Sequence, residues 1–333
     1  MPRVSVLLPV RDAARTLRAA AVSILRQTER DLTLVCVDDG SSDATPEVLD
    51  RLAARDRRVR VVRGTGEGIA RALERGRALC EAEVVARMDA DDVAHPRRLE
   101  LQLSALDADP SLAAVGGRVR LFPRRAVRGG MVRYAAWLNG LVTPELVLRD
   151  LLIEAPLVHP AALIRARALR DVGGWRDGPF PEDYDLWLRL AAGGGRLTNL
   201  PELVLDWREG EGRLTRTDPR YALARHVVRK CAFLAEHVVG RGEVVLWGAG
   251  PTGKAFADAL AAERIGVRAF LEVDPAKIGR TARGAPVLPF REAPRFRGLP
   301  ILVAVGAPGA RELIRAELRA MEFEELRDFW CVS

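Results

Sequence analysis

The chain has 333 residues, which is at the upper limit of what one hydrophobic core usually serves, so two domains are expected. With 48% hydrophobic and 29% charged residues and a mean hydropathy of −0.02, the composition excludes a disordered tail, a collagen-like repeat and a bundle of membrane helices. The net charge is +7, and more than half of it falls in residues 208–241. Because neither body of the protein is strongly basic, no nucleic-acid partner is expected.

Four cysteines are spread along the chain without the spacing of a metal site, namely Cys36, Cys80, Cys231 and Cys331. Two of them stand inside apolar runs, where a buried thiol is the simplest interpretation. The sequence begins directly with a strand-like apolar run, without the regions of a signal peptide. No run of about 18 apolar residues follows. These features predict a cytoplasmic protein without a transmembrane segment, and they leave peripheral contact with a membrane open.

Residues 1–207 alternate short apolar runs with helical patterns, as a parallel α/β sheet requires. We expect strands at 4–8, 32–37, 59–62 and 84–88. Apolar residues at helical spacing predict helices at 17–25, 47–54 and 69–79, and Pro96 suits the first turn of a further helix. The run 4–8 is almost entirely apolar, which is typical of a strand buried on both faces.

Residues 122–139 break this pattern with four arginines and a Gly129-Gly130 pair. We expect a mobile excursion over a site here rather than part of the core. Regular structure is expected again in a strand at 161–164, a helix at 182–190 and a strand at 203–207.

Residues 208–241 are basic and partly helical and are interpreted as a connector. A second α/β region is expected over 242–333, with strands at 244–247, 269–273, 301–305 and 329–332 and helices at 254–262 and 310–321. The predicted organisation is therefore a domain at 1–207, a connector at 208–241 and a smaller domain at 242–333.

Acidic residues follow two of the predicted strands, Asp38 and Asp39 after the second and Asp89, Asp91 and Asp92 after the fourth. The carboxyl ends of parallel strands are where open α/β sheets bind their ligands. Three acids within four residues repel one another unless they are exposed, protonated or neutralised by a cation. A divalent ion such as Mg²⁺, bound together with substrate phosphates, would satisfy this arrangement. A capped turn is the alternative that needs no ligand.

Four segments, in this order, carry a resemblance to a known family: VSVLLPVRDAARTL, LVCVDDGSSDAT, VVARMDADDVAHPRRL and PEDYDLWLRL. Together they resemble the family-2 glycosyltransferases of the GT-A fold, over residues 3–207. The resemblance implies transfer of a sugar from a nucleotide donor to an acceptor hydroxyl, with inversion at the anomeric carbon. The expected fold is α/β: a GT-A domain with a mostly parallel central sheet, followed by a small Rossmann-like domain.

The resemblance also implies roles for individual residues. The donor nucleotide would be held at strand ends and turns by Pro9, Val10, Arg11, Asp38, Asp39, Gly68, Asp89 and Ala90. A divalent cation, Mg²⁺ or Mn²⁺, would be bound at Asp89, Asp91 and Asp92. Asp183, beside Glu182, matches the general base of the family, and Glu182 and Asp185 are the next candidates.

The family mostly uses UDP-sugars, so a UDP-sugar is the expected donor. The acceptor would be a saccharide, a lipid-linked compound or another hydroxyl compound in polysaccharide or glycoconjugate synthesis. The chemistry agrees with these roles, because the leaving diphosphate gains negative charge that a metal ion stabilises. Attack from the opposite face of the sugar needs a carboxylate within hydrogen-bond reach of the acceptor hydroxyl.

Two positions depart from the pattern of the family. Gly210 stands where the family often has a histidine, so one phosphate or metal partner is missing. Glu74 stands where the family commonly has asparagine, which puts one polar contact in doubt. His159 and Arg208 are weaker candidates for the site. His159 would face the diphosphate, and a structural histidine is the equal alternative.

The predicted C-terminal domain carries the turn GAGPTG between a strand and a helix. Gly248, Gly250 and Gly253 suit a turn whose backbone amides cradle a phosphate, and close packing of helix on strand is the alternative without a ligand. No catalytic group is evident there, so we expect a binding role. A chain that ends near Gly240 should then still bind the donor. Homo-oligomer formation is left open.

Two other functions fit parts of the sequence. A nucleotide- or NAD-binding sensor or oxidoreductase would act through the C-terminal domain, but the acids Asp39, Asp89, Asp91 and Asp183 argue against it. A sugar-1-phosphate nucleotidyltransferase would need a glycine-rich loop directly after the first strand, and PVRDAARTL contains no glycine.

Overall fold

The computed structural model describes residues 1–210 and 212–333, which form two compact units. Unit 1 comprises Met1–Leu148, Pro156–Gly178 and Glu182–Thr217. Unit 2 comprises Arg149–Ala155, Pro179–Pro181 and Asp218–Ser333. Two short segments from the N-terminal part of the chain thus belong to unit 2. The expected domain limits at residues 207 and 241 stay a prediction.

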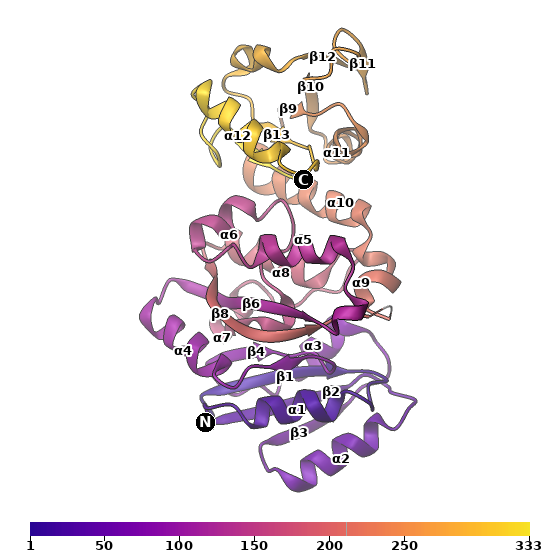
Figure 1. Ribbon diagram of the computed structural model, residues 1–333, viewed down its shortest axis with the longest axis vertical. Coiled ribbons are helices and arrows are strands. Elements are labelled where there is room, and N and C mark those ends of the chain that lie inside the picture. Colours follow the sequence, from indigo (N-terminus) through magenta and orange to yellow (C-terminus); the bar gives the residue numbers. More distant parts are fainter. Residues whose placement is uncertain (211) are drawn as a thin grey trace. The chain divides into compact units, whose positions relative to one another are not determined.

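Unit 1 is built on an eight-stranded sheet in the order β3-β2-β1-β4-β7-β6-β8-β5. Its strands are β1 (Val4–Val10), β2 (Leu32–Asp38), β3 (Val59–Arg63), β4 (Val84–Arg87), β5 (Val93–Ala94), β6 (Leu112–Phe122), β7 (Leu163–Arg165) and β8 (Arg196–Arg208). Of these strands, β3, β2, β1, β4, β6 and β8 are labelled in Figure 1. The first four in the sheet order are parallel, and so are β6 and β8, whereas β7 and β5 are antiparallel to their neighbours. The expected α/β class is confirmed, with a mixed second half of the sheet.

The strand β1 is buried along its whole length because helices cover both faces of the sheet. Val6 packs in the same core cluster as Leu17 of α1 (Leu17–Leu25). Leu7 points to the other face, toward α3 (Ile69–Arg77), where a Cβ on Gly76 would lie 2.3 Å from its Cδ1. Alternate residues of a strand point to opposite faces, so a strand covered on both sides needs an unbroken apolar run.

The other helices of this region are α2 (Thr45–Arg55), α4 (Arg98–Ala108), α5 (Gly129–Leu138), α6 (Pro144–Asp150), α7 (Ala166–Asp171), α8 (Glu182–Ala192) and α9 (Leu214–Thr217). Of these, α6 ends in the first segment that belongs to unit 2. The helices expected near 47–54, 69–79 and 182–190 are confirmed as α2, α3 and α8, each within a few residues of its limits.

The segment 122–139 differs from the expected irregular excursion. It begins at the end of the long strand β6 and continues into the helix α5. Ala135 and Leu138, three residues apart, are buried on one face of that helix, and the arginines are exposed. The expectation of an irregular segment is wrong because the arginines were given more weight than this short apolar spacing, which marks a helix face.

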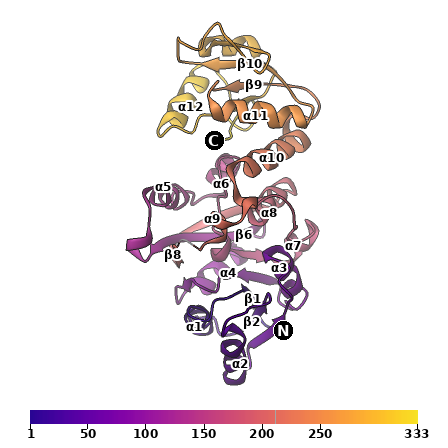
Figure 2. The ribbon, with the colours of Figure 1, turned by 90° about the vertical axis from the view of Figure 1, so that its right-hand side faces the viewer.

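Unit 2 contains a six-stranded sheet in the order β11-β12-β10-β9-β13-β14. Its strands are β9 (Glu243–Trp247), β10 (Gly266–Glu272), β11 (Thr281–Ala282), β12 (Ala285–Pro289), β13 (Ile301–Val303) and β14 (Phe329–Cys331). Its main helices are α10 (Leu223–Leu234), α11 (Pro251–Ala262) and α12 (Ala310–Ala320), and α10 lies beside α11 (Figure 2). β10, β9, β13 and β14 are parallel, as the sequence predicts for an α/β region.

Candidate active site

Three carboxylates gather after the carboxyl end of β4. The ligand oxygens of Asp89, Asp91 and Asp92 all lie within 4.8 Å of one another. Asp92 is 1% exposed, and Asp89 forms an ion pair with Arg87, the last residue of β4. The structure thus brings the three predicted metal-binding acids to one place, at the edge of the sheet where α/β proteins bind ligands.

Burial opposes the ionisation of this acidic cluster. Loss of solvent, and secondly the carboxylate of Asp89, raise the pKa of Asp91 to about 6. The same causes raise the pKa of Asp92 well above its ordinary value. Within the described residues, the buried Oδ2 of Asp92 has no hydrogen-bond partner. A buried polar atom without a partner is costly, and a divalent cation would both bind it and relieve the repulsion, so these residues fit such an ion.

Arg208, the last residue of β8, ties the acidic cluster to that strand. Its backbone N–H donates to Oδ1 of Asp92 over 2.7 Å, and its Nε donates to the backbone oxygen of Asp91 over 2.6 Å. Its guanidinium lies over the ring of Phe122, 4.4 Å from the ring centroid. The structure therefore brings this predicted residue to the acids across more than a hundred residues of sequence.

Asp39, after β2, holds the loop that precedes α3. One carboxylate oxygen accepts the backbone N–H groups of Gly66 and Glu67, over 3.2 and 2.9 Å, and the other accepts that of Gly68 over 2.8 Å. Gly68 has a φ of +93°, which a residue with a Cβ rarely adopts. Asp39 is therefore the organising group of the loop in which the sequence predicts donor-binding residues.

The remaining predicted donor residues lie around the ends of β1, β2 and β4. Asp38 is 4% exposed and is bound by the protein itself, through the N–H of Ser41 at 3.1 Å and the Arg63 guanidinium at 2.8 Å. Arg11 is exposed beside the Asp39 loop, since its Nη1 lies 3.6 Å from where a Cβ on Gly66 would stand. The last three predicted residues, Pro9, Val10 and Ala90, are buried at these strand ends.

The first turn of α8 carries three carboxylates with different surroundings. Glu182 and Asp185 are buried, at 2% and 1% exposure. Asp185 forms an ion pair with Arg189 at 2.7 Å. Asp183 is half-buried, and its Oδ1 accepts the backbone N–H of Tyr184 over 2.7 Å. Asp183 is thus the most accessible acid of the three, which is what a base that meets a bound acceptor requires.

His159 is buried next to this turn, at 5% exposure. The indole Nε1–H of Trp175 donates to its Nε2 over 2.9 Å, and its Nδ1 lies 3.6 Å from Oε1 of Glu182. Glu74 accepts the backbone N–H of Trp175 over 2.6 Å. The unusual glutamate noted in the sequence therefore anchors the turn that carries Trp175.

The glycine turn of unit 2 is closely packed at two of its three glycines, Gly248 and Gly253. A Cβ on Gly253 would lie 1.8 Å from the backbone oxygen of Gly248, whereas none of the described atoms lies within 4 Å of one on Gly250. Gly248 has a φ of +111°. The N–H of Ala249, in the same turn, is already taken by Glu272 at 3.0 Å. Phosphate binding at this turn stays a prediction.

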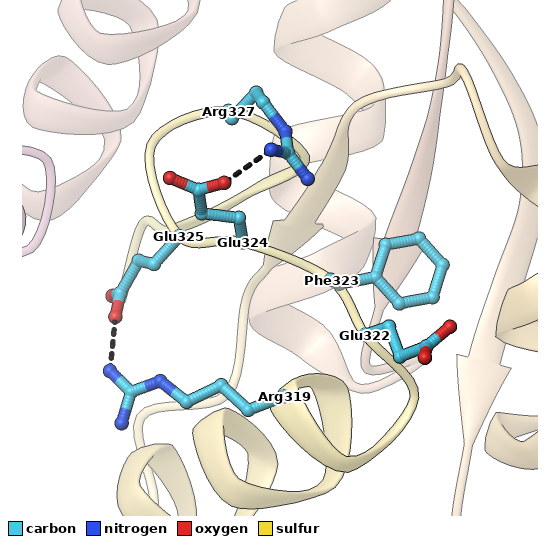
Figure 3. A pocket seen from close by; sticks show the side chains of 6 residues that line it. All are labelled: Arg319, Glu322, Phe323, Glu324, Glu325 and Arg327. Carbon is cyan, nitrogen blue, oxygen red and sulfur yellow. Dashed lines mark hydrogen bonds and ion pairs between the residues drawn. The ribbon is translucent and has the colours of Figure 1, made fainter.

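A surface hollow of about 480 Å³ lies elsewhere in unit 2, between the end of α12 and the segment before β14 (Figure 3). It is lined by Arg319, Glu322, Phe323, Glu324, Glu325 and Arg327. Two ion pairs cross its wall, between Arg327 and Glu324 and between Arg319 and Glu325. None of the predicted site residues lines this hollow, and four of its five charged residues pair with one another.

Sequence reasoning missed three side chains that shape the candidate active site, namely Arg87, Glu209 and Arg213. Arg87 pairs with Asp89, and Glu209 holds Arg213 at 2.6 Å. The sequence suggested Trp175 only as a side chain that could stack on a sugar, whereas in the structure it binds His159. Arg213 lies over the ring of Trp207 at 4.2 Å, and its charge opposes the burial that raises the pKa of Asp91. An available signal was the group of Arg208, Arg213 and Arg216 directly after a predicted strand end.

The sequence is similar to a known protein family and to several named proteins. The sequence matches Glycosyl transferase family 2 over residues 5–173. It is 30% identical over 227 residues to "Putative glycosyltransferase EpsE" of Bacillus subtilis, an alignment that covers 67% of this chain and 78% of that protein. None of the described helices is both long and apolar enough to cross a membrane.

Two solved structures share the fold. The mannosyltransferase PcManGT of Pyrobaculum calidifontis, in complex with GDP-Man and Mn²⁺, is 24% identical, with a TM-score of 0.55 over 79% of this chain and 69% of that one. TarS 1–349 of S. aureus, in complex with UDP-GlcNAc, is 15% identical, with a TM-score of 0.58 over 78% of this chain and 71% of that one. The chain belongs to glycosyl transferase family 2 and is a glycosyltransferase with the GT-A fold.

Proposed function

We propose that this glycosyltransferase transfers a sugar, with inversion, from a uridine diphosphate sugar to an acceptor hydroxyl in a reaction that requires a divalent cation. The observation that carries the proposal is the cluster of Asp89, Asp91 and Asp92, in which a buried oxygen of Asp92 lacks a partner within the described chain. Mg²⁺ or Mn²⁺ bound there would stabilise the negative charge that the leaving diphosphate gains.

The residues of the chain itself would hold the two substrates on either side of the reacting carbon. Asp39 and Arg11 border the loop proposed to bind the base and ribose, and Arg208 supplies a positive charge beside the acids. The proposal of a uridine base rests on the family resemblance. The two structural neighbours hold GDP-Man and UDP-GlcNAc, so a guanosine donor is the alternative to be tested first.

Asp183 is the proposed general base. Its carboxylate would take the proton of the acceptor hydroxyl as the acceptor oxygen forms its bond to the anomeric carbon. The bond from that carbon to the diphosphate oxygen breaks in the same step, so the nucleoside diphosphate leaves from the opposite face and the product is inverted. The proposed acceptor is a saccharide or a lipid-linked compound, and the proposed location is the cytoplasm.

The test is a screen of the purified chain against nucleotide sugars with Mn²⁺, with Mg²⁺ and with EDTA, together with calorimetry of UDP and GDP binding. In the calorimetry, Asp91→Asn should weaken binding in Mn²⁺ by about ten-fold or more, because it removes one charged ligand of the cluster. Asp258→Asn, an exposed acid of α11 paired with Arg283, is the matched control and should bind as the unchanged chain does. Equal binding by Asp91→Asn, or binding unaffected by EDTA, would contradict the assignment.

A further inference from the structure

The surroundings of Glu182 contain a buried polar chain that the proposed function does not use. Trp175, 3% exposed, donates its indole N–H to His159, which in turn lies against Glu182. The three residues come from the turn after α7, from the segment before β7 and from the first position of α8. Asp183 directly follows Glu182 on that helix, so whatever orients Glu182 also orients the turn that carries the proposed base.

The direction of this chain is set by the chemistry of its first member. An indole N–H can only donate, so Nε2 of His159 must accept, and its ring proton must be on Nδ1. That proton is then on the nitrogen that lies 3.6 Å from Oε1 of Glu182. A histidine that carried both protons could not accept from Trp175. The arrangement therefore holds His159 neutral, with one tautomer.

The charged groups that face His159 are Glu182 on α8, Arg87 on β4 and Asp89 after β4. Burial, and then the charge of Arg87, lower the pKa of His159, against the effects of Glu182 and Asp89. The ring is also packed edge-on against Trp187 of α8, with centroids 6.0 Å apart. Its position is therefore fixed by packing as well as by the hydrogen bond.

We propose that Trp175 and His159 are positioning residues that hold Glu182, and with it the first turn of α8 and Asp183, in the orientation needed for proton abstraction. The inference deepens the proposed function and rests on it for the role of Asp183. Trp175 is itself held by Glu74, which accepts its backbone N–H. The glutamate that departs from the family pattern thus supports this chain from α3.

The first test needs no donor. The chain has four histidines, His95, His159, His226 and His237, so ¹⁵N-labelled histidine spectra can resolve each ring. His159 should be neutral, with its proton on Nδ1, to a pH below the ordinary pKa of histidine, because its burial lowers its pKa. In Trp175→Phe, which removes the donor together with the five-membered ring that carries it, the His159 ring should gain a proton at a higher pH. A charged ring, or a proton on Nε2, at pH 7 in the unchanged protein would overturn the inference.

The second test compares two replacements of His159. In His159→Asn the amide N–H stands close to the position of Nδ1 and can still face Glu182, whereas in His159→Gln it stands close to that of Nε2. Amide exchange in the first turn of α8 should stay near the unchanged rate in His159→Asn and rise about ten-fold or more in His159→Gln and Trp175→Phe. Trp330→Phe, in β14, is the control and should exchange at the unchanged rate. Equal exchange in all four variants overturns the positioning role.

The third test uses the donor that the screen identifies. Trp175→Phe and His159→Gln should lower kcat by about 10–100-fold and leave the donor Kd within about two-fold. The reason is that Trp175 and His159 orient the proposed general base, Asp183, and do not contact the diphosphate. His159→Asn should keep most of the kcat of the unchanged protein. Equal kcat values for the Asn and Gln variants would overturn the inference. A screen that finds no donor at all would contradict the proposed function, and the spectra and exchange rates would still decide the state of His159.

Discussion

Arg208 binds the acidic cluster through its backbone N–H and through its guanidinium, and only the second contact depends on its side chain. The backbone N–H that binds Asp92 is present with any residue at this position, but the Nε bond to Asp91 and the guanidinium over Phe122 are not. Substitution should therefore remove the positive charge without dismantling the end of β8.

Arg208→Gln should weaken binding of UDP with Mn²⁺ by about ten-fold, the usual effect of losing one charge-assisted hydrogen bond. The affinity of Arg208→Lys should lie between those of the unchanged protein and of Arg208→Gln, since lysine keeps the charge but not the planar donor group. Arg120→Gln on β6, where an exposed arginine pairs with Asp206, is the control and should bind normally by calorimetry. Equal affinity of the Arg208→Gln and Arg120→Gln proteins would show that the positive charge of Arg208 does not reach the nucleotide.

Asp183→Asn should lower turnover by about 10²–10⁴-fold with donor affinity nearly unchanged, because a base acts on the acceptor hydroxyl. Asp171→Asn, an exposed acid that pairs with Arg167 at the end of α7, is the control. Initial rates and donor Kd values check both variants. Near-normal turnover by Asp183→Asn would move the base to Glu182 or Asp185, and a product with retained configuration would exclude the mechanism.

At the scale of elements, the start of α11 shows how closely a helix can depend on a glycine. Gly253 faces the carbonyl of Gly248 at the end of β9, and a methyl group there would overlap its oxygen. Gly250, the residue just before α11, has an ordinary φ of −81° and open space at its Cβ position. The same glycine motif therefore contains one position set by packing and one that packing leaves open.

Gly253→Ala should destabilise unit 2 by about 1–3 kcal/mol or more, the usual cost of overpacking, because α11 must move away from β9. Gly250→Ala should change the unfolding free energy by less than about 0.5 kcal/mol. Denaturant unfolding, with amide exchange to assign the affected elements, measures both. A similar loss in the two variants would show that backbone freedom, and not the contact with Gly248, explains the motif.

At the scale of the whole molecule, unit 2 depends on residues from two distant parts of the sequence. Arg315 on α12 is 1% exposed and pairs with Asp150 at 2.6 Å and with Glu325 at 2.8 Å. Nζ of Lys230 donates to the backbone oxygens of Ile153 and Val332, over 2.7 and 3.1 Å. A chain that ends near Gly240 would lose Arg315 and Val332, and with them the partners of Asp150 and Lys230 in unit 2. The prediction that such a chain still binds the donor therefore requires unit 1 to fold without these contacts.

Arg315→Met should destabilise unit 2 by up to about 3–5 kcal/mol, because it removes the buried cation that Asp150 and Glu325 share and leaves them only the more exposed Arg149 and Arg319. Arg319→Met removes a mostly exposed arginine from the same Glu325 and should cost about 1 kcal/mol or less. Denaturant unfolding monitored by amide exchange in residues 149–155 measures the difference. Equal costs would mean that Arg315 does not hold this segment in unit 2.

Several elements could be predicted because their signals are local. The apolar run of β1, the Gly68 turn before α3 and the acids after β4 each lie within a few neighbouring residues, and the structure has all of them where expected. The sequence did not predict the helix α5 and the first half of β8, because they have few apolar positions and those positions become buried only by packing or pairing with β6.

The sequence by itself determined the family, the parallel first half of the sheet and the set of acids, since periodicity and strand-end motifs are properties of consecutive residues. Only the tertiary structure decided which distant groups meet one another around those acids and the first turn of α8. Arg208 reaches Asp92, Trp175 reaches His159 and Glu74 reaches the Trp175 turn across gaps of up to 116 residues. Such pairs depend on the order and register of the strands, which are set only when the whole sheet is assembled. A local sequence pattern therefore does not predict them.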